Sequence, residues 1–449
     1  MKKSRVALLL VMCLALLTAC GGNGNTPSEP DTQEDTHLNE AYSAYMKELE
    51  AKRDDILLYN WQKGFSFDED LYEEVPNGDT DAVAFLDVWG DETPEMIYIC
   101  ATRFEGNKSY AAEVHVFSFK DGELTEIYKH EELDALAGGG MSYRLFTVNG
   151  EKNLWIYEAH YSEELLEIYS QLSTDDSDGA MTAQRTCTKR IWWDYDPETD
   201  VETDTSEWYL DSIESTEEEY EAAIPSEEDQ KDGLVMRNLR YYEYSEDADY
   251  AEETVYPQKG LAMTYDEAIS YLREKLGITL DMTVDETAFF ESLPDFSFSS
   301  GVGGWSTDIY IEPDGTFTGY FHDSELGMTG DDYPYGSIYV CDFNGRFGEV
   351  TRVDEYTYSM KLLELNVDKT EGEEWIEDGV RYIVSYPYGL ENADEMTVYL
   401  PGAQMSKLPL GFKDWVRGYD WYETGTPPTL PFYGLYSVAD EYGFAQSSD

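Results

Sequence analysis

The chain has 449 residues, of which 41% are hydrophobic and 14% aromatic, so it can bury the cores of two domains. Its 94 acidic residues outnumber 30 basic ones and give a formal net charge of −64 at pH 7. Because such a polyanion repels phosphate groups and anionic lipid headgroups, the composition excludes nucleic acid as a partner, while a basic protein partner stays open.

The N-terminus predicts a secretory signal over residues 1–19. A positive start, MKKSR, precedes an apolar run that is too short for an ordinary membrane-spanning helix. The tetrapeptide LTAC, which ends at Cys20, resembles the bacterial lipobox, where the chain is cut before Cys and the thiol receives a diacylglycerol. The resemblance implies a lipid anchor on Cys20 and a place outside the cytoplasm, on the cell membrane. The alternative is a plain secretory signal cut near Ala19.

Residues 20–36 predict a flexible tether, since GGNGNTPSEPDTQEDT is rich in Gly, Pro, Asn and acidic residues and offers little to bury. One helix is expected next, over 38–60, because Ala41, Tyr45 and Leu49 recur on one helical face.

An α+β domain is expected over residues 37–255, since short alternating runs separated by turn residues follow this helix. Asp121-Gly122 and Asn149-Gly150 fall between such runs and are hairpin signals. The predicted strands cover residues 82–88, 96–102, 111–120, 124–130, 143–148, 153–160, 184–195 and 234–244.

The loop FLDVWGDETPEM, between the first two of these strands, resembles the calcium-binding loops of FG-GAP and VCBS-type repeats. Asp87, Asp91 and Glu95 offer carboxylates at a suitable spacing, and Thr93 offers a carbonyl. Trp89 stands where an oxygen donor is expected, and calcium needs about six to eight oxygens. The loop therefore predicts either a calcium site or, as the ligand count favours, a metal-free connection between strands. No other cofactor is predicted.

Residues 194–232 hold 17 acidic residues and one basic residue. We expect a solvated excursion here, because unpaired carboxylates are costly to bury. Within it, Thr216 and Glu219 have the spacing of a capping box, which predicts a short helix.

Three cysteines remain beyond residue 20, and none has CxxC spacing. Their odd number gives no sign of a disulfide framework or a zinc ribbon. Cys100 and Cys187 can pair, but three buried thiols, with Cys341 the third, are the favoured interpretation because free Cys packs as a small hydrophobe.

A second domain is expected over residues 262–420. A capping box at Thr264 opens a helix that Gly277 ends, and hairpin after hairpin follows from Trp305. This pattern predicts a meandering β-barrel or sandwich, followed by a C-terminal tail over 421–449. The predicted strands cover residues 306–311, 316–322, 337–343, 347–353, 356–365, 381–386 and 396–400.

The segment SSGVGGWSTDIYIEPDGTFTGYF and the strands after it resemble an uncharacterised C-terminal module of lipoproteins from Gram-positive anaerobes. That module is similar to lipocalin-like barrels, and Gly303-Gly304-Trp305 matches the lipocalin G-x-W. The resemblance implies a barrel and carries no assigned function. The predicted fold class is therefore α+β, mostly antiparallel β, in two domains.

The loop HDSELGMTGDDYPYG is a candidate ligand site, because it lies at one end of the predicted barrel, where ligands often bind. Chance clustering is the alternative in so acidic a chain. The candidate residues are His322, Asp323, Glu325, Asp331, Asp332 and Tyr333.

No catalytic residue is predicted. The five histidines lie outside metal-binding motifs, and no nucleophile elbow or phosphate-binding glycine loop is present. The sequence predicts a membrane-anchored, non-catalytic binding protein of the cell envelope, whose partner is an envelope polymer, a small ligand or a basic protein. The alternative is an extracytoplasmic hydrolase that acts on carbohydrate through a pair of carboxylates. Only the distance between the two carboxyl groups in space identifies such a pair.

Overall fold

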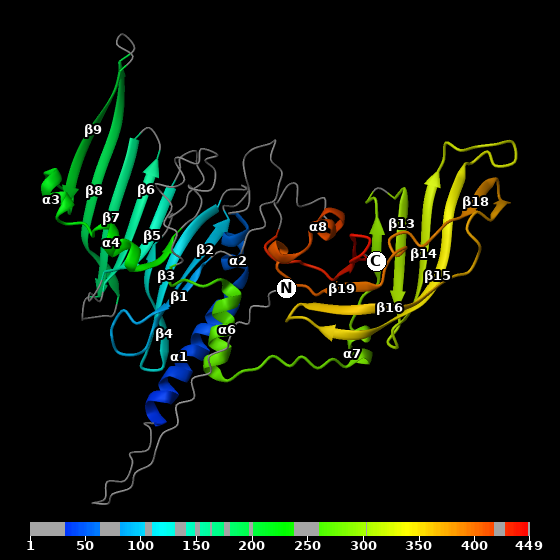
Figure 1. Ribbon diagram of the computed structural model, residues 1–449, viewed down its shortest axis with the longest axis horizontal. Coiled ribbons are helices and arrows are strands. Elements are labelled where there is room, and N and C mark those ends of the chain that lie inside the picture. Colours follow the sequence, from blue (N-terminus) through cyan, green and yellow to red (C-terminus); the bar gives the residue numbers. More distant parts are fainter. Residues whose placement is uncertain are drawn as a thin grey trace, which may run out of the picture.

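The computed structural model is elongated, with two strand-rich units in line along its long axis (Figure 1). It describes residues 32–62, 81–103, 110–130, 141–148, 153–161, 164–174, 180–196, 201–237, 260–301, 303–416 and 427–447. The predicted signal, Cys20, residues 21–31 of the tether and the Asn149-Gly150 turn lie outside these residues. The flexible tether predicted up to residue 36 is wrong for residues 32–36, which are helical. Of the helices in the described ranges, none has the length and apolar character needed to span a bilayer.

Two helices open the N-terminal unit, where the sequence predicts one. They are α1 (Thr32–Ala51) and α2 (Arg53–Gln62), and the chain leaves the helix for one residue at Lys52. Both pieces still bury their predicted apolar face, since Leu49 from α1 and Ile56 from α2 enter one core.

Two antiparallel sheets make up most of this unit. The predicted Asp121-Gly122 hairpin is confirmed, because both residues have positive φ, 54° and 83°, as a two-residue turn of type I′ requires. The four-stranded sheet has the order β1 (Val83–Leu86), β2 (Glu95–Arg103), β3 (Tyr110–Lys120), β4 (Glu123–His130). The seven-stranded sheet has the order β10 (Ile213–Ser215), β9 (Val201–Leu210), β8 (Met181–Asp196), β7 (Glu164–Thr174), β6 (Leu154–Tyr161), β5 (Met141–Thr147), β11 (Leu234–Arg237).

In its described part, 194–196 and 201–232, the acidic stretch forms strands and short helices, so the expected excursion from the fold is wrong there. It contributes β9 and β10 to the sheet, followed by α3 (Glu217–Glu221) and α4 (Glu227–Asp232). The capping box of Thr216 and Glu219 is confirmed. Acidic and apolar side chains alternate along the strands of this stretch and lie on different faces of its short helices. In α3, Tyr220 is therefore buried while its acidic neighbours face solvent.

Residues 260–263 join the two sheets through backbone hydrogen bonds. Ala262 N donates to the Val235 oxygen of β11 at 2.8 Å, and Met263 N donates to the Val83 oxygen of β1 at 2.6 Å. At Gly260 a Cβ would lie 2.4 Å from the Val235 oxygen, so only glycine allows this close approach.

The helix α6 (Tyr265–Leu276) begins and ends as predicted, with a capping box at Thr264 and a left-handed Gly277. It nevertheless belongs to the N-terminal unit, because Ala268 and Leu272 are buried in the core that also holds α1 and α2. The predicted domain boundary before residue 262 is therefore wrong. The change of unit comes after Gly277, where the chain runs toward α7 (Glu286–Glu291).

The C-terminal unit is a closed antiparallel barrel of eight strands, which confirms the predicted meander. A hairpin of β17 (Glu374–Glu377) and β18 (Val380–Val384) extends one wall, since β18 pairs in parallel with the start of β15. The barrel order is β12 (Phe296–Ser299), β13 (Trp305–Ile311), β14 (Thr316–Glu325), β15 (Ser337–Arg352), β16 (Thr357–Val367), β19 (Glu395–Tyr399), β20 (Gly434–Ser437), β21 (Tyr442–Gln446) and again β12.

Two predictions for this unit need correction. The expected tail over 421–449 supplies β20 and β21, and Leu435 and Phe444 from these strands are fully buried. The strands expected at 337–343 and 347–353 are one strand, β15, whose pairing with β16 shifts register after Arg346 and after Gly348. Short helices η1 (Met405–Lys407) and α8 (Leu410–Val416) precede the last two strands.

Aromatic rings fill the barrel. The Phe298 ring lies within 5.1 Å, centroid to centroid, of the rings of Trp305, Trp415, Tyr442 and Phe444. A side chain at Gly319 would collide with another core ring, since its Cβ would lie 2.1 Å from an atom of Phe343. The interior of this barrel is thus a packed core, which leaves its outer surface for binding.

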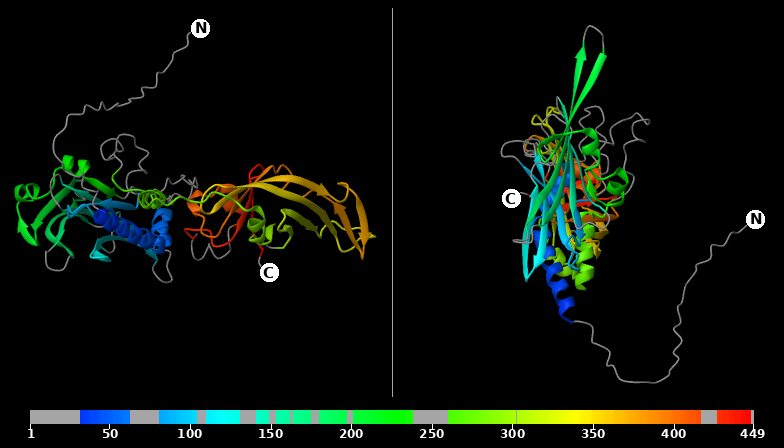
Figure 2. Two further views of the ribbon diagram at one scale, coloured as in Figure 1. Left: turned by 90° about the horizontal axis from the view of Figure 1, so that it is seen from below. Right: turned by 90° about the vertical axis from the view of Figure 1, so that its left-hand side faces the viewer.

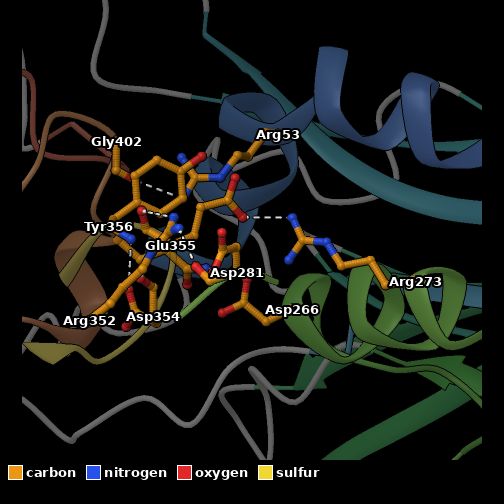
Figure 3. A network of polar contacts seen from close by, with 10 residues as sticks. Arg53, Asp266, Arg273, Asp281, Arg352, Asp354, Glu355, Tyr356 and Gly402 are labelled. Carbon is orange, nitrogen blue, oxygen red and sulfur yellow. Dashed lines mark hydrogen bonds and ion pairs between the residues drawn. The ribbon is translucent and has the colours of Figure 1, made fainter. Parts of the chain in front are cut away.

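Polar contacts join the two units (Figure 3). Arg53 and Arg273 reach from α2 and α6 to the barrel, where Arg53 Nη2 donates to the Gly402 oxygen and Arg273 Nη2 pairs with Glu355 Oε2, each at 2.7 Å. Lys407 of the barrel pairs in return with Asp266 of α6. The hairpin β17–β18 lies at the opposite end of the barrel from this junction (Figures 1 and 2).

Candidate functional site

The acidic loop between β1 and β2 uses its carboxylates to hold its own backbone. Asp87 Oδ1 accepts hydrogen bonds from Gly90 N at 2.5 Å and Asp91 N at 3.1 Å, and its Oδ2 accepts one from Glu92 N at 3.1 Å. Asp91 Oδ1 accepts one from Thr93 N at 3.0 Å. The contact of Asp91 with Thr93 is an Asx turn, in which an aspartate side chain replaces a backbone turn. The contacts of Asp87 reach amides three to five residues further along the loop.

Glu95, the third carboxylate of this loop, is 1% exposed. Its Oε2 accepts a hydrogen bond from Val88 N at 2.8 Å, and its Oε1 accepts one from Ser118 Oγ at 3.2 Å. Burial raises the pKa of Glu95 to about 7. Asp87 and Asp91 thus lie at the surface and Glu95 in the core, an arrangement that favours the metal-free connection over a calcium site.

The residues of the predicted barrel site face different directions. His322 lies on the outer face of β14, where its Nδ1 is 3.2 Å from Ser306 Oγ, while Asp323 alternates to the opposite face. Glu325, Asp331 and Asp332 are exposed at the end of β14 and in the loop that follows. Tyr333 lies beneath the Arg381 guanidinium, whose Cζ is 4.5 Å from the ring centroid. The six residues therefore share a region but form no common cluster.

Several large apolar side chains in this region are exposed. Leu326 and Tyr335 are 68% and 69% exposed in the β14–β15 loop, and Met328 beside them and Ile376 of β17 are also exposed. Tyr335 N donates to the Gly379 oxygen at 3.0 Å, so the loop lies against the β17–β18 hairpin. We call this surface, residues 326–336 together with 374–384, the distal tip. The sequence pattern indicated the acids of this surface but not its apolar side chains.

A buried carboxylate with two histidines connects the two sheets of the N-terminal unit. Glu158 Oε1 on β6 lies 2.9 Å from His130 Nε2 on β4 and 3.6 Å from His160 Nε2. The hydroxyl of Tyr128 is 3.0 Å from His130 Nδ1. Burial alone would raise the pKa of Glu158, but the two imidazoles lower it to about 2. No sequence motif predicts this group, because its members come together only when the two sheets pack against each other.

A second group outside any motif combines a thiol, a carboxylate and an imidazole. Cys100 on β2 and Glu113 and His115 on β3 place one ligand atom each within 4.8 Å of one another. Glu126 and Lys129 of β4 contact the group from its outer side. Burial raises the pKa of the Cys100 thiol to about 12.

The three cysteines of the described chain are free and buried, as favoured from the sequence. The alternative pairing of Cys100 with Cys187 is wrong, because the two thiols belong to separate cores of the N-terminal unit. Cys341 is buried in the barrel.

An open hollow of about 500 Å³ lies along α6 at the junction of the units. Its one basic residue, Lys407, already pairs with Asp266. The lining is formed by Thr264, Asp266, Glu267, Ser270, Tyr271, Glu274 and Lys407.

Among the described residues, burial raises the pKa of two carboxyl groups, those of Glu95 and Glu391. They lie in different units, so they do not form the pair of carboxyl groups, about 5 to 9.5 Å apart, that glycoside hydrolysis needs.

Comparison with known proteins gives no further guide to function: no family model, no curated protein and no solved structure matches the chain.

Proposed function

We propose that this protein is a lipid-anchored binding protein of the cell envelope that holds a partner outside the cytoplasm at the distal tip of its barrel. The anchor rests on the lipobox resemblance at Cys20. The binding surface rests on one observation, the cluster of exposed apolar side chains at the tip, with Leu326 and Tyr335 about two-thirds exposed.

Exposed apolar clusters with a polar rim are typical of protein interaction sites, because association removes their apolar area from water. The rim here is acidic, with Asp331 and Asp332 in the same loop and Glu374 and Glu377 on the neighbouring hairpin. An acidic rim attracts basic groups and repels anionic polymers. Of the three predicted partner classes, the tip therefore favours a protein with a basic and apolar surface.

The filled barrel supports a macromolecular partner over a small ligand. Small molecules bind in concave sites that bury most of their surface, and the rings around Phe298 occupy the space where a barrel holds such a ligand. The tip also lies at the far end of the barrel from the N-terminal unit (Figure 2). A tether attached through Cys20 would leave the tip free to meet a partner.

Affinity capture from solubilised cell envelope, with the chain from residue 21 onward as bait, tests the proposal. The double variant Leu326→Asp/Tyr335→Asp should lose the captured protein, since both substitutions place charge in the apolar cluster. Ile213→Asp is the matched control, because Ile213 is 72% exposed in the N-terminal unit. Capture should also weaken as salt screens the acidic rim. Equal capture by the tip variant and the wild type would refute the tip as the binding surface.

A further inference from the structure

We infer that Cys100, Glu113 and His115 form a binding site for a divalent metal ion of the zinc class. The site lies in the N-terminal unit, far from the distal tip, and goes beyond the proposed function.

Strand pairing holds the three ligands together. Cys100 of β2 is the direct partner of Glu113 on β3, and His115 follows two residues later on the same face. The Tyr98 ring, which pairs with His115 across the strands, stacks on the imidazole with 4.9 Å between centroids. A site built on paired strands is more precisely positioned than one on loops.

The hydrogen bond of His115 to Glu126 fixes which ring nitrogen is free. His115 Nδ1 lies 2.5 Å from Glu126 Oε1, and since an ionised carboxylate only accepts, Nδ1 carries the hydrogen. In the neutral imidazole, Nε2 then presents a lone pair. A carboxylate that holds the outer nitrogen of a histidine is the usual outer partner of a metal-binding imidazole.

The lone pair of His115 Nε2 faces other acceptors. The side chain is 10% exposed, and Nε2 is buried without a hydrogen-bond partner in the described structure. Its neighbour Glu113 Oε2, at 3.3 Å, is itself an acceptor. Two facing acceptors repel each other unless a proton or a metal ion lies between them.

The separation suits a metal ion. Ligands about 2.0 to 2.1 Å from a tetrahedral ion lie about 3.3 Å from one another, which is the distance between His115 Nε2 and Glu113 Oε2. Lys129 Nζ lies 3.2 Å from the other oxygen, Glu113 Oε1, and leaves Oε2 for the ion. Three protein ligands leave the fourth position of the tetrahedron to water.

The donor set selects the class of metal. A thiolate and an imidazole suit zinc and related transition metals, whereas calcium and magnesium take oxygen ligands. Binding would release the thiol proton of Cys100 to solvent, and the sulfur would then bond to the ion as a thiolate. The competing explanation is a protonated His115 held between Glu113 and Glu126, with no metal.

Cobalt titration of the purified full chain, without an affinity tag and under reducing conditions, separates the two explanations. Thiolate ligation of Co²⁺ gives a charge-transfer absorption that histidine and carboxylate ligands do not give. We expect this band to saturate at a single equivalent of Co²⁺ and to disappear when Zn²⁺ is added. It should be absent in Cys100→Ser and unchanged in the matched control Cys187→Ser, whose thiol is also buried.

Two further variants test the site where Cys100→Ser does not fold, as judged by circular dichroism of the metal-free chain. His115→Gln removes a ligand and should weaken Co²⁺ binding at least as much as Glu126→Gln. Glu126→Gln changes an exposed outer partner and should weaken binding by about 10- to 100-fold. No charge-transfer band in the wild type, a band that survives in folded Cys100→Ser, or equal affinity in Glu126→Gln would overturn the assignment.

Discussion

The guanidinium of Arg53, on α2 of the N-terminal unit, donates to the Gly402 oxygen of the barrel at 2.7 Å, and its Cζ lies 4.5 Å from the Tyr356 ring centroid. Its side chain is 13% exposed. With 30 basic residues in the whole chain, the presence of Arg53, Arg273 and Lys407 at one junction concentrates scarce positive charge where two acidic units meet. The Arg53 contact is thus one of several polar contacts that join the two units.

Removing this contact should weaken the coupling between the units, because the other polar contacts of the junction remain. Arg53→Ala loses a charge-assisted hydrogen bond and a cation–π contact, together about 2 to 4 kcal/mol. We expect calorimetry to show the barrel and the N-terminal unit melting separately, and X-ray scattering to show a larger radius of gyration. Arg346→Ala is the control, because Arg346 pairs with Glu364 at the exposed surface and should change stability by less than about 1 kcal/mol. A single, unshifted transition in Arg53→Ala would contradict the coupling.

The Glu158 cluster should make the N-terminal unit sensitive to acid. The folded pKa of Glu158, about 2, lies below its ordinary value of 4.5. Its stabilisation, up to about 3 kcal/mol, is therefore present above pH 4.5 and is lost as pH falls toward 2. In urea unfolding, Glu158→Gln should be less stable than the wild type at pH 6, and the difference should shrink in acid. The exposed Glu217→Gln serves as control, and a pH-independent difference would count against this account.

Glu95 should show the opposite dependence. Its folded pKa of about 7 lies above 4.5, so the folded state holds the proton more tightly than the unfolded state between these values. Stability should fall by up to about 3 kcal/mol as pH rises from 4.5 to 7. Glu95→Gln removes the titrating group and should flatten this part of the profile. If the variant and the wild type lose stability in parallel, Glu95 ionises normally in the folded protein.

Calcium should not stabilise the protein. The carboxylate of Asp87 already accepts hydrogen bonds from three backbone amides, and Glu95 is bonded inside the core. A ligand at 100 times its Kd would stabilise the folded state by about 2.7 kcal/mol. We therefore expect an unchanged melting temperature at millimolar calcium. A concentration-dependent rise that Asp87→Asn abolishes would restore the calcium site.

Helix caps and tight turns could be predicted from the sequence because they depend on residues only a few positions apart. The capping boxes at Thr216 and Thr264, the Gly277 stop and the Asp121-Gly122 turn all form as predicted. Each depends on neighbours in the chain, so tertiary packing had little opportunity to override it.

The core into which each element packs could not be predicted in this way. A cap sets where α6 begins, but its apolar face fits a core of either unit, and only the structure places it with α1. The four- and five-residue strands β20 and β21 are too short for a clear alternating pattern. The acids of 194–232 predicted exposure to solvent because their number hid the few apolar positions among them, such as Tyr220, which α3 buries.

The candidate sites show the same difference between local and long-range features. Asp87 and Glu95 have calcium spacing in the sequence, yet turn to backbone amides in the fold. Cys100, Glu113 and His115 have no motif spacing, yet strand register brings them together. Register is a long-range property, which a single sequence does not reveal.

Photo-crosslinking in living cells tests the central claim most directly. A photoreactive amino acid placed at position 335, in the distal tip, should form an adduct of defined mass with one envelope protein, whereas the same group at position 213 should not. The adduct should disappear when Leu326→Asp is added. No adduct from position 335, or the same adduct from both positions, would contradict a binding surface at the tip.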